Sequence, residues 1–215
     1  MKHPSIRELF DYWDTRRGRR PAPERGDIEP GAIRRVLADT FILAFEPRAG
    51  HPFRLAGTRV CALFGRELKG EPFLDLWPAG SRSEVRDLLA IVAHESVGVV
   101  ASVSGASTAG AALSLEFLAL PLSHHGRSDA RLLGALAPNV PPSLSSGMAP
   151  SIGPSIAPTW LGTSAVVDLR LGTHRYVGAA IAESLAPRAM PGDLGPATRD
   201  GRIRHGFVVH DGGQP

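Results

Sequence analysis

Cysteine is the scarcest informative residue in this 215-residue chain, because it occurs once, at Cys61. A single cysteine excludes an intrachain disulfide framework and any zinc site built on several thiolates. Lysine is almost as rare and occurs only at Lys2 and Lys69, so arginine supplies most of the positive charge. The net charge is only +3, which does not by itself indicate a nucleic-acid partner.

Long hydrophobic runs are absent as well. No stretch approaches the roughly 20 consecutive apolar residues of a membrane-spanning helix, and the N-terminus has no apolar run long enough for a signal peptide. We therefore expect a cytoplasmic protein without a membrane partner. Hydrophobic residues still make up 43% of the chain, which is ordinary for a domain with a core.

Catalytic signatures are also missing, so the sequence predicts no enzyme. We find no phosphate-binding glycine loop, nucleophile elbow or H-E-x-x-H helix. His124 and His125 are adjacent in a polar turn, where neighbouring side chains tend to diverge, and a shared metal site is not expected there. No catalytic residue or metal ligand is predicted.

The most densely patterned stretch covers residues 53–77, F-R-L-A-G-T-R-V-C-A-L-F-G-R-E-L-K-G-E-P-F-L-D-L-W. The alternation that begins at Phe53 predicts a short strand. Thr58 is then a candidate N-cap for a short helix, and Gly65 is placed for a left-handed C-cap. Gly70 repeats that stop. Short helices of this kind are expected to cover one face of a sheet and can enclose a small cavity.

The apolar side chains of this stretch have two open interpretations. They line a small ligand pocket, or they simply fill the core of the domain. The side chains concerned are Val60, Cys61, Leu63, Phe64, Phe73 and Trp77. Cys61 lies in an apolar helix, where an inert buried thiol is the ordinary state.

Glu116 is the polar candidate for the same pocket. It is embedded in the apolar run A-A-L-S-L-E-F-L-A-L-P-L, where a carboxylate needs a partner. Arg54 and Arg59 are the candidate partners. Glu116 either forms a structural ion pair, or lies on an exposed face of the sheet, or anchors a ligand in the pocket.

An amphipathic helix is predicted at residues 5–14. Ser5 and Glu8 form a capping-box pattern, and the apolar residues recur at helical spacing. The apolar stripe consists of Ile6, Leu9, Phe10 and Trp13. A helix this short must bury that stripe, either on its own domain or against a partner such as a second copy of the chain.

An arginine-rich run follows at residues 16–25. Its basic residues are Arg16, Arg17, Arg19, Arg20 and Arg25. Such a run can contact phosphates, but no recognition helix or zinc motif accompanies it, and three acidic residues follow closely. We favour a solvated or salt-bridged connector, and nucleic-acid binding is the less favoured alternative. A second short helix is predicted at 27–37.

The remaining elements follow from local patterns. Strands are predicted at residues 40–45, around 53, and at 97–104, 111–122 and 131–137. The longest helix is predicted at 82–95, where Ser81 and Glu84 form another capping-box pattern. This order predicts an α+β fold, a five-stranded antiparallel sheet with helices on one face, an N-terminal helical extension and an irregular C-terminal tail.

The arrangement resembles a PAS domain, and the string G-T-R-V-C-A-L-F-G-R-E-L-K-G resembles the region of short helices in that family. More narrowly, the chain is similar to short stand-alone bacterial PAS proteins that open with a Tyr-Trp helix and an Arg-rich loop. The matching pieces are Y-W-D-T-R-R-G-R-R-P-A-P-E-R-G-D-I-E-P, F-R-L-A-G-T, F-G-R-E-L-K-G, L-E-F-L-A-L-P-L, L-L-G-A-L-A-P and W-L-G.

The resemblance implies a non-enzymatic sensor or adaptor in bacterial signal transduction, usually a homodimer. Its partner would be a regulatory protein or kinase, with a small-molecule ligand as a further possibility. Two alternatives stay open: a pure protein-interaction scaffold without a ligand, and a nucleic-acid-associated regulator that uses the run at 16–25. No cofactor is named, because the turn that carries the cysteine of flavin photosensors has none here, and His94 points off the apolar stripe of its helix.

The predicted domain organisation has five parts. They are an N-terminal helical extension with the Arg-rich loop (1–37), a PAS-like domain (38–137), a Pro/Ser-rich flexible insertion (138–158), a docked extension or extra strand (159–182) and a mostly disordered tail (183–215). The insertion departs from the family pattern, which runs more directly to W-L-G. Alternation at 165–171 supports an extra strand.

Overall fold

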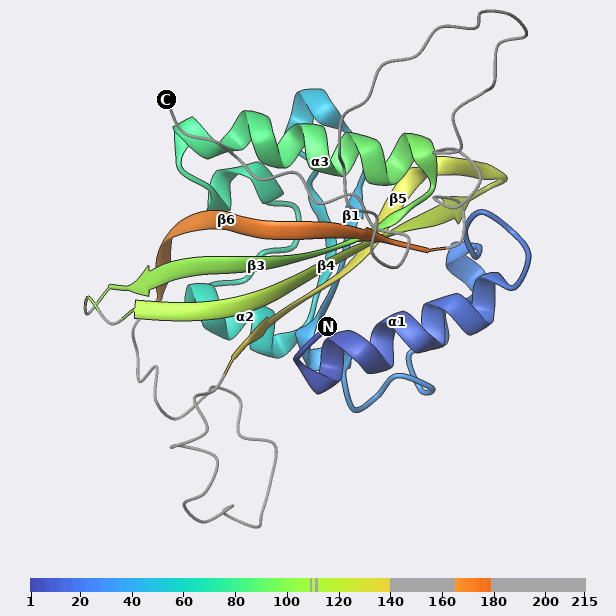
Figure 1. Cartoon of the computed structure of the whole chain (residues 1–215), viewed down its shortest axis with the longest axis horizontal. Helices are drawn as coiled ribbons and strands as arrows, with labels where there is room; N and C mark the ends of the chain where they lie inside the picture. The colour runs from blue at the N-terminus through green and yellow to red at the C-terminus, as the bar shows by residue number, and fades with distance from the viewer. Residues whose placement is uncertain (109, 111, 140–164, 179–215) are drawn as a thin grey trace, which may run out of the picture. The chain divides into compact units, whose positions relative to one another are not determined.

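The computed structural model of the chain describes residues 1–108, 110, 112–139 and 165–178. Most of the insertion predicted at 138–158 and all of the tail predicted at 183–215 lie outside the described residues. The described residues build one antiparallel sheet covered by helices (Figure 1).

Within the described residues the sheet has six strands in the order β2-β1-β5-β4-β3-β6. Their bounds are Thr40–Ala44 (β1), Phe53–Ala56 (β2), Gly98–Ser107 (β3), Ala112–His124 (β4), Arg127–Pro138 (β5) and Val166–Val177 (β6). All neighbours pair antiparallel, so the α+β class with a PAS-like sheet is confirmed. The sixth strand is β6, which lies within the segment expected as a docked extension or an extra strand (159–182) and pairs with β3 from Gly98↔Val177 to Ser107↔Val166.

The described residues form three α-helices, α1 (Pro4–Arg17), α2 (Thr58–Phe64) and α3 (Arg82–Glu95). None of them is long and apolar enough to cross a membrane. Short 3₁₀ helices are Arg25–Asp27 (η1), Leu37–Asp39 (η2), Pro47–Ala49 (η3), Phe73–Leu76 (η4) and Ala79–Ser81 (η5).

The helix predicted at 27–37 is wrong. The backbone there forms turns between η1 and η2. Ile33 and Val36 are nevertheless buried. The spacing of these residues therefore correctly indicated which side chains are buried, although the backbone is not helical.

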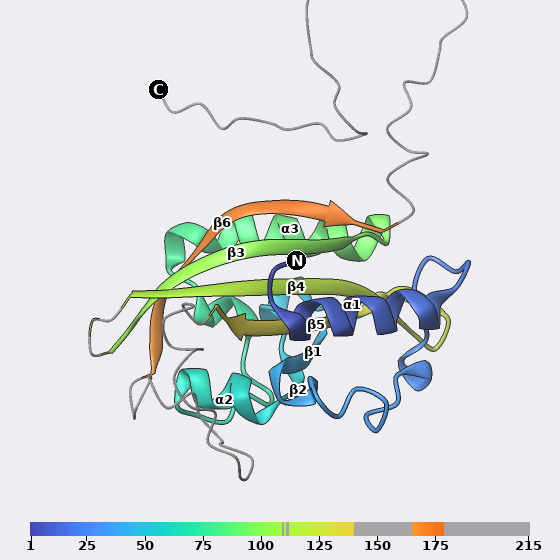
Figure 2. The same cartoon turned by 60° about the horizontal axis from the view of Figure 1, so that its bottom comes forward.

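Both faces of the sheet are covered, with α3 and α1 on opposite sides (Figures 1 and 2). The helices α2, α3 and η4 pack on one face, around Phe41 and Phe117. The other face carries α1 and residues 28–36, packed against Leu118 and Leu120. The N-terminal extension therefore covers the second face of the sheet, and helices are not confined to one face. The apolar run of β4 is nearly continuous because both of its faces are buried.

The helix caps match their predictions only in part. Gly65 ends α2 with a left-handed φ of 64°, as predicted. Thr58 does not cap that helix, because Gly57 occupies the N-cap position. The N-cap of α1 is His3, whose Nδ1 accepts from the Ser5 amide at 3.2 Å. Ser81 is an N-cap by position but makes no capping hydrogen bond through its side chain.

Candidate functional site

The predicted pocket residues mostly lie in a close-packed aromatic core. The Phe73 ring stacks on Phe41 at a centroid distance of 5.6 Å and on Phe117 at 5.8 Å. Trp77 meets Phe73 edge-on at 5.9 Å. Three further residues of the predicted set belong to the same buried cluster: Val60, Leu63 and Phe64. Cys61 is partly buried and packs against this cluster. Of the two interpretations, the structure therefore favours core packing for most of these side chains.

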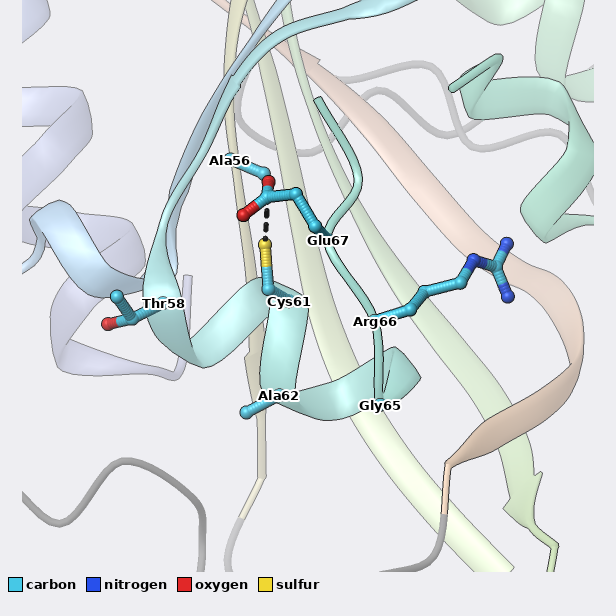
Figure 3. A pocket seen from close by; sticks show the side chains of 7 residues that line it. All are labelled: Ala56, Thr58, Cys61, Ala62, Gly65, Arg66 and Glu67. Atoms are coloured by element: carbon cyan, nitrogen blue, oxygen red, sulfur yellow. Dashed lines mark hydrogen bonds between the residues drawn. The ribbon is translucent and has the colours of Figure 1, made fainter. Parts of the chain in front are cut away.

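A shallow cavity of about 330 Å³ lies on the outer side of α2 (Figure 3). It is lined by Ala56, Thr58, Cys61, Ala62, Gly65, Arg66 and Glu67. The Cys61 thiol donates to Glu67 Oε1 at 3.5 Å, whereas Arg66 points away from this pair. A cavity of this size is at the lower limit of typical ligand pockets, which span roughly 300–1,000 Å³.

The electrostatics of this cavity disfavour a reactive thiol. Burial, followed by the negative charge of Glu67, raises the pKa of Cys61. Glu67 is held in its charged form, because the backbone N–H of Lys69 and the Cys61 thiol lower the pKa of its carboxyl. Nucleophilic chemistry needs a thiolate, so this arrangement does not favour such chemistry at Cys61.

A second cavity of about 240 Å³ lies where the end of α2 and the segment after η4 meet the start of β6. Its lining residues are Phe64, Arg66, Asp75, Leu76, Trp77, Pro78, Val166 and Val167. Phe64 and Trp77 from the predicted set lie here. Sequence reasoning missed this cavity because β6 enters it only through long-range pairing with β3.

Glu116 does not belong to either cavity. It lies on the same side of β4 as Leu118, opposite Phe117, and its carboxylate accepts from the backbone amides of Lys2 at 2.9 Å and His3 at 2.6 Å. The predicted partners Arg54 and Arg59 bind other carboxylates. Their assignment to Glu116 is corrected, because the strand alternation points Glu116 toward α1.

Asp39 is a functional candidate that the sequence analysis missed. The residue is 2% exposed. Its carboxylate accepts hydrogen bonds from Arg59 Nε at 2.7 Å, from Arg59 Nη2 at 2.6 Å and from the Ser5 hydroxyl at 2.7 Å. The hydrogen bond to Asp39 raises the pKa of Arg59. Ser5 belongs to α1 and Arg59 to α2, so one buried carboxylate connects the two helices.

The sequence matches a known protein family over most of the described residues. The family model described as PAS domain matches residues 1–137. The chain belongs to the PAS-domain family. The matched residues include α1, end within β5 and leave β6 outside. A comparison with curated proteins finds no match. Membership in this family indicates a sensory or signalling module.

The apolar stripe of α1 packs on the sheet of this PAS domain itself. Ile6, Leu9 and Trp13 are fully buried, and Phe10 is half-buried. Trp13 Nε1 donates to the Pro121 carbonyl at 2.8 Å. In this structure most of the stripe is therefore covered by the sheet, and only Phe10 stays partly accessible.

The arginine-rich run of the PAS domain is held by neighbouring acidic groups. Arg17 pairs with Asp14 at 2.7 Å, and Arg20 pairs with Asp27 at 2.7 Å. A looser contact of 3.4 Å joins Arg16 and Glu29. The Arg20 bond also lowers the pKa of Asp27. These pairs support the salt-bridged connector.

The remaining histidine predictions have mixed outcomes. His94 is exposed on α3, as its position off the stripe indicated, and meets the Phe45 ring edge-on at 5.3 Å. The rings of His124 and His125 do not diverge, because their centroids are 4.0 Å apart. Among the described residues, no group of three or more His, Cys, Asp or Glu side chains gathers as a metal site.

Proposed function

We propose that this PAS domain is a non-catalytic sensor or adaptor in bacterial signal transduction. It acts as a homodimer and changes its contacts with a regulatory protein or kinase. A ligand or partner bound beside α2 is the input, and the packing of α1 on the sheet is the output. The observation that carries the proposal is the Asp39 carboxylate, which binds Arg59 of α2 and Ser5 of α1 at once.

The mechanism is a shift between two packings of α1. Arg59 lies on α2 between Thr58 and Cys61, two residues of the outer cavity. A ligand that displaces α2 alters the geometry of the Arg59–Asp39 hydrogen bonds. Through Asp39 it also alters the hydrogen bond from the Ser5 hydroxyl. A ligand shifts the equilibrium only by the difference in its affinity for the two packings. The hydrogen bonds of Asp39 must therefore be stronger in one packing than in the other.

The first alternative is a pure protein-interaction scaffold with no ligand. The close packing of Phe41, Phe73, Phe117 and Trp77 favours it, because this aromatic core leaves little internal space. Absorbance and denaturing mass spectrometry of the purified protein distinguish the two. Release of a small molecule supports the sensor, whereas a ligand-free protein that still binds its regulator supports the scaffold.

The second alternative is a nucleic-acid-associated regulator. It has less support, because Arg16, Arg17 and Arg20 already form ion pairs with neighbouring carboxylates. Binding to a labelled duplex at increasing salt tests it. A steep loss of affinity with salt, abolished by the triple arginine-to-alanine variant, would favour this function.

Hydrogen exchange of the full chain tests the α2-to-α1 link. We expect Arg59→Ala to speed amide exchange across α1, although residue 59 is not part of that helix. Arg54→Ala is the matched control, because it breaks an exposed pair with Glu46 and should leave α1 unchanged. Unaltered exchange of α1 in Arg59→Ala contradicts the proposal. Light scattering over a range of concentrations tests the homodimer separately.

A further inference from the structure

His51 is a buried histidine whose ring makes no hydrogen bond. The residue is 0% exposed, and within the described part of the chain neither Nδ1 nor Nε2 has a partner. Buried polar atoms are normally paired, and each exception calls for an explanation. The backbone of His51 is also unusual, with a left-handed φ of 58°, which a non-glycine residue adopts only when its surroundings enforce it.

The His51 ring contacts an aromatic ring, and two charged side chains act on it without a hydrogen bond. The His51 ring stacks on Phe45 with centroids 5.0 Å apart. Phe45 also contacts the ring of His94 from α3. The charges that act on His51 are Arg86 of α3, which disfavours its protonation, and Glu46 of its own turn, which favours it. None of these groups is hydrogen-bonded to the ring, so a proton on His51 has no acceptor in place.

The turn that carries His51 is attached to the segment that supplies part of the aromatic core. The Phe73 amide donates to the His51 carbonyl at 3.2 Å, and the Leu74 amide donates to the Gly50 carbonyl at 3.1 Å. Phe53 completes the attachment by donating to the Glu71 carbonyl and accepting from the Gly70 amide. These four backbone bonds join residues 50–53 to residues 70–74.

Gly50 shows how close the two segments lie. A Cβ at this position would be 2.9 Å from Pro72 Cβ, and its φ of 69° is left-handed. Only glycine satisfies both conditions without strain. The turn and the segment 70–74 are therefore closely fitted to each other.

We propose that His51 is an acid-sensitive latch: its protonation releases the turn at residues 46–52 from α3 and, through the backbone bonds, opens the aromatic core beneath η4. The ligand of the latch is a proton. This inference is independent of the Asp39 link and stands whether the domain senses a small molecule or serves as a scaffold.

The direction of the effect follows from linkage. Burial, followed by the charge of Arg86, lowers the pKa of His51 from 6.5 to about 4. The opened state thus binds a proton more readily than the closed state, so the stability of the closed state is greatest above pH 6.5 and decreases as the pH falls toward 4. Between these two pKa values the opened population rises, by about 30-fold at pH 5 relative to pH 7.5.

Two measurements on the full chain test the latch. Hydrogen exchange at the amides of Phe73 and Leu74, corrected for intrinsic rates, reports opening at pH 7.5 and pH 5. The wild type should show the roughly 30-fold rise. His51→Asn should remove most of it, because asparagine tolerates a left-handed φ and does not titrate in this range. His94→Gln, which alters the exposed histidine on the same Phe45 ring, should retain it.

The second measurement needs no variant, so it applies even if His51→Asn fails to fold. The ring of His51 is titrated by NMR in the wild type. An apparent pKa far below 6.5, with exchange at Phe73 and Leu74 accelerating over the same pH range, supports the latch. A titration near 6.5, or an equal acid-induced opening in His51→Asn, overturns it.

Discussion

Arg59 binds Asp39 through two parallel hydrogen bonds, 2.7 Å from Nε to Oδ1 and 2.6 Å from Nη2 to Oδ2. We expect Asp39→Asn to lower the free energy of unfolding by about 2 kcal/mol, because it removes the charge and weakens the bonds of a buried acceptor. Urea denaturation measures the change. Glu46→Gln disrupts the exposed pair with Arg54 and should cost less than about 1 kcal/mol. Equal effects of the two substitutions would show that the Asp39 bridge has no special role in stability.

Gly134 provides space for the ring of Phe41 on the neighbouring strand, since a Cβ at residue 134 would overlap Phe41 Cζ and Cε2. Gly134→Ala is expected to destabilise the fold by about 1–3 kcal/mol through overpacking. Thermal unfolding checks it against Gly26→Ala, because a Cβ at Gly26 meets no atom within 4 Å. The double variant Gly134→Ala/Phe41→Leu should recover part of the loss. A melting temperature unchanged by Gly134→Ala would contradict this packing.

Glu116 holds the chain before α1 by accepting the amides of Lys2 and His3. Glu116→Gln keeps one acceptor oxygen and loses the charge, so we expect a loss of about 1–2 kcal/mol in the free energy of unfolding. Exchange at the start of α1 should also accelerate. Glu84→Gln on the exposed side of α3 is the control. An unaltered melting temperature would mean that these bonds contribute nothing net.

Cys61 should react slowly with iodoacetamide at pH 7.5, because burial and the charge of Glu67 raise its pKa. Glu67→Gln removes that charge and is expected to accelerate alkylation severalfold through a larger thiolate fraction. Mass spectrometry over time measures the rate. Glu71→Gln is a milder control, since Glu71 is the last and smallest contributor to the same shift. A slower reaction in Glu67→Gln would contradict the electrostatic explanation.

Local elements could be predicted from the sequence because their signals are local. The helix predicted at 82–95 coincides with α3, Arg82–Glu95, since its apolar stripe has the period of a helix. The β-prone runs became strands within a few residues of their predicted ends. Gly65 ends α2 as predicted. In each case a few neighbouring residues carry the whole argument.

The capping hydroxyls were harder to predict. Ser5 lies beside a helix start, but its hydroxyl binds Asp39, 34 positions away, instead of capping α1. A propensity describes only the local competitors for a hydrogen bond. A carboxylate brought close by the fold outcompetes the local backbone amide.

The candidate site shows the same limit. Alternation along β4 indicates that Glu116 and Phe117 face opposite sides, yet it does not say which helix covers each side. The partners of Glu116 and Arg59 depend on contacts between segments that are separated in the sequence. The outer cavity beside α2 contains only Cys61 from the predicted set.

By itself the sequence determined the class of the fold, the order of α1, α2, α3 and strands β1 to β5, and the resemblance to the PAS family that residues 1–137 confirm. These properties depend on periodicity, glycine stops and the order of short motifs. Only the tertiary structure decided that α1 covers the second face, that Asp39 joins α1 to α2, and that His51 is buried without a partner. Those outcomes depend on which distant surfaces meet, because burial and hydrogen bonding are set by contacts that no local pattern encodes.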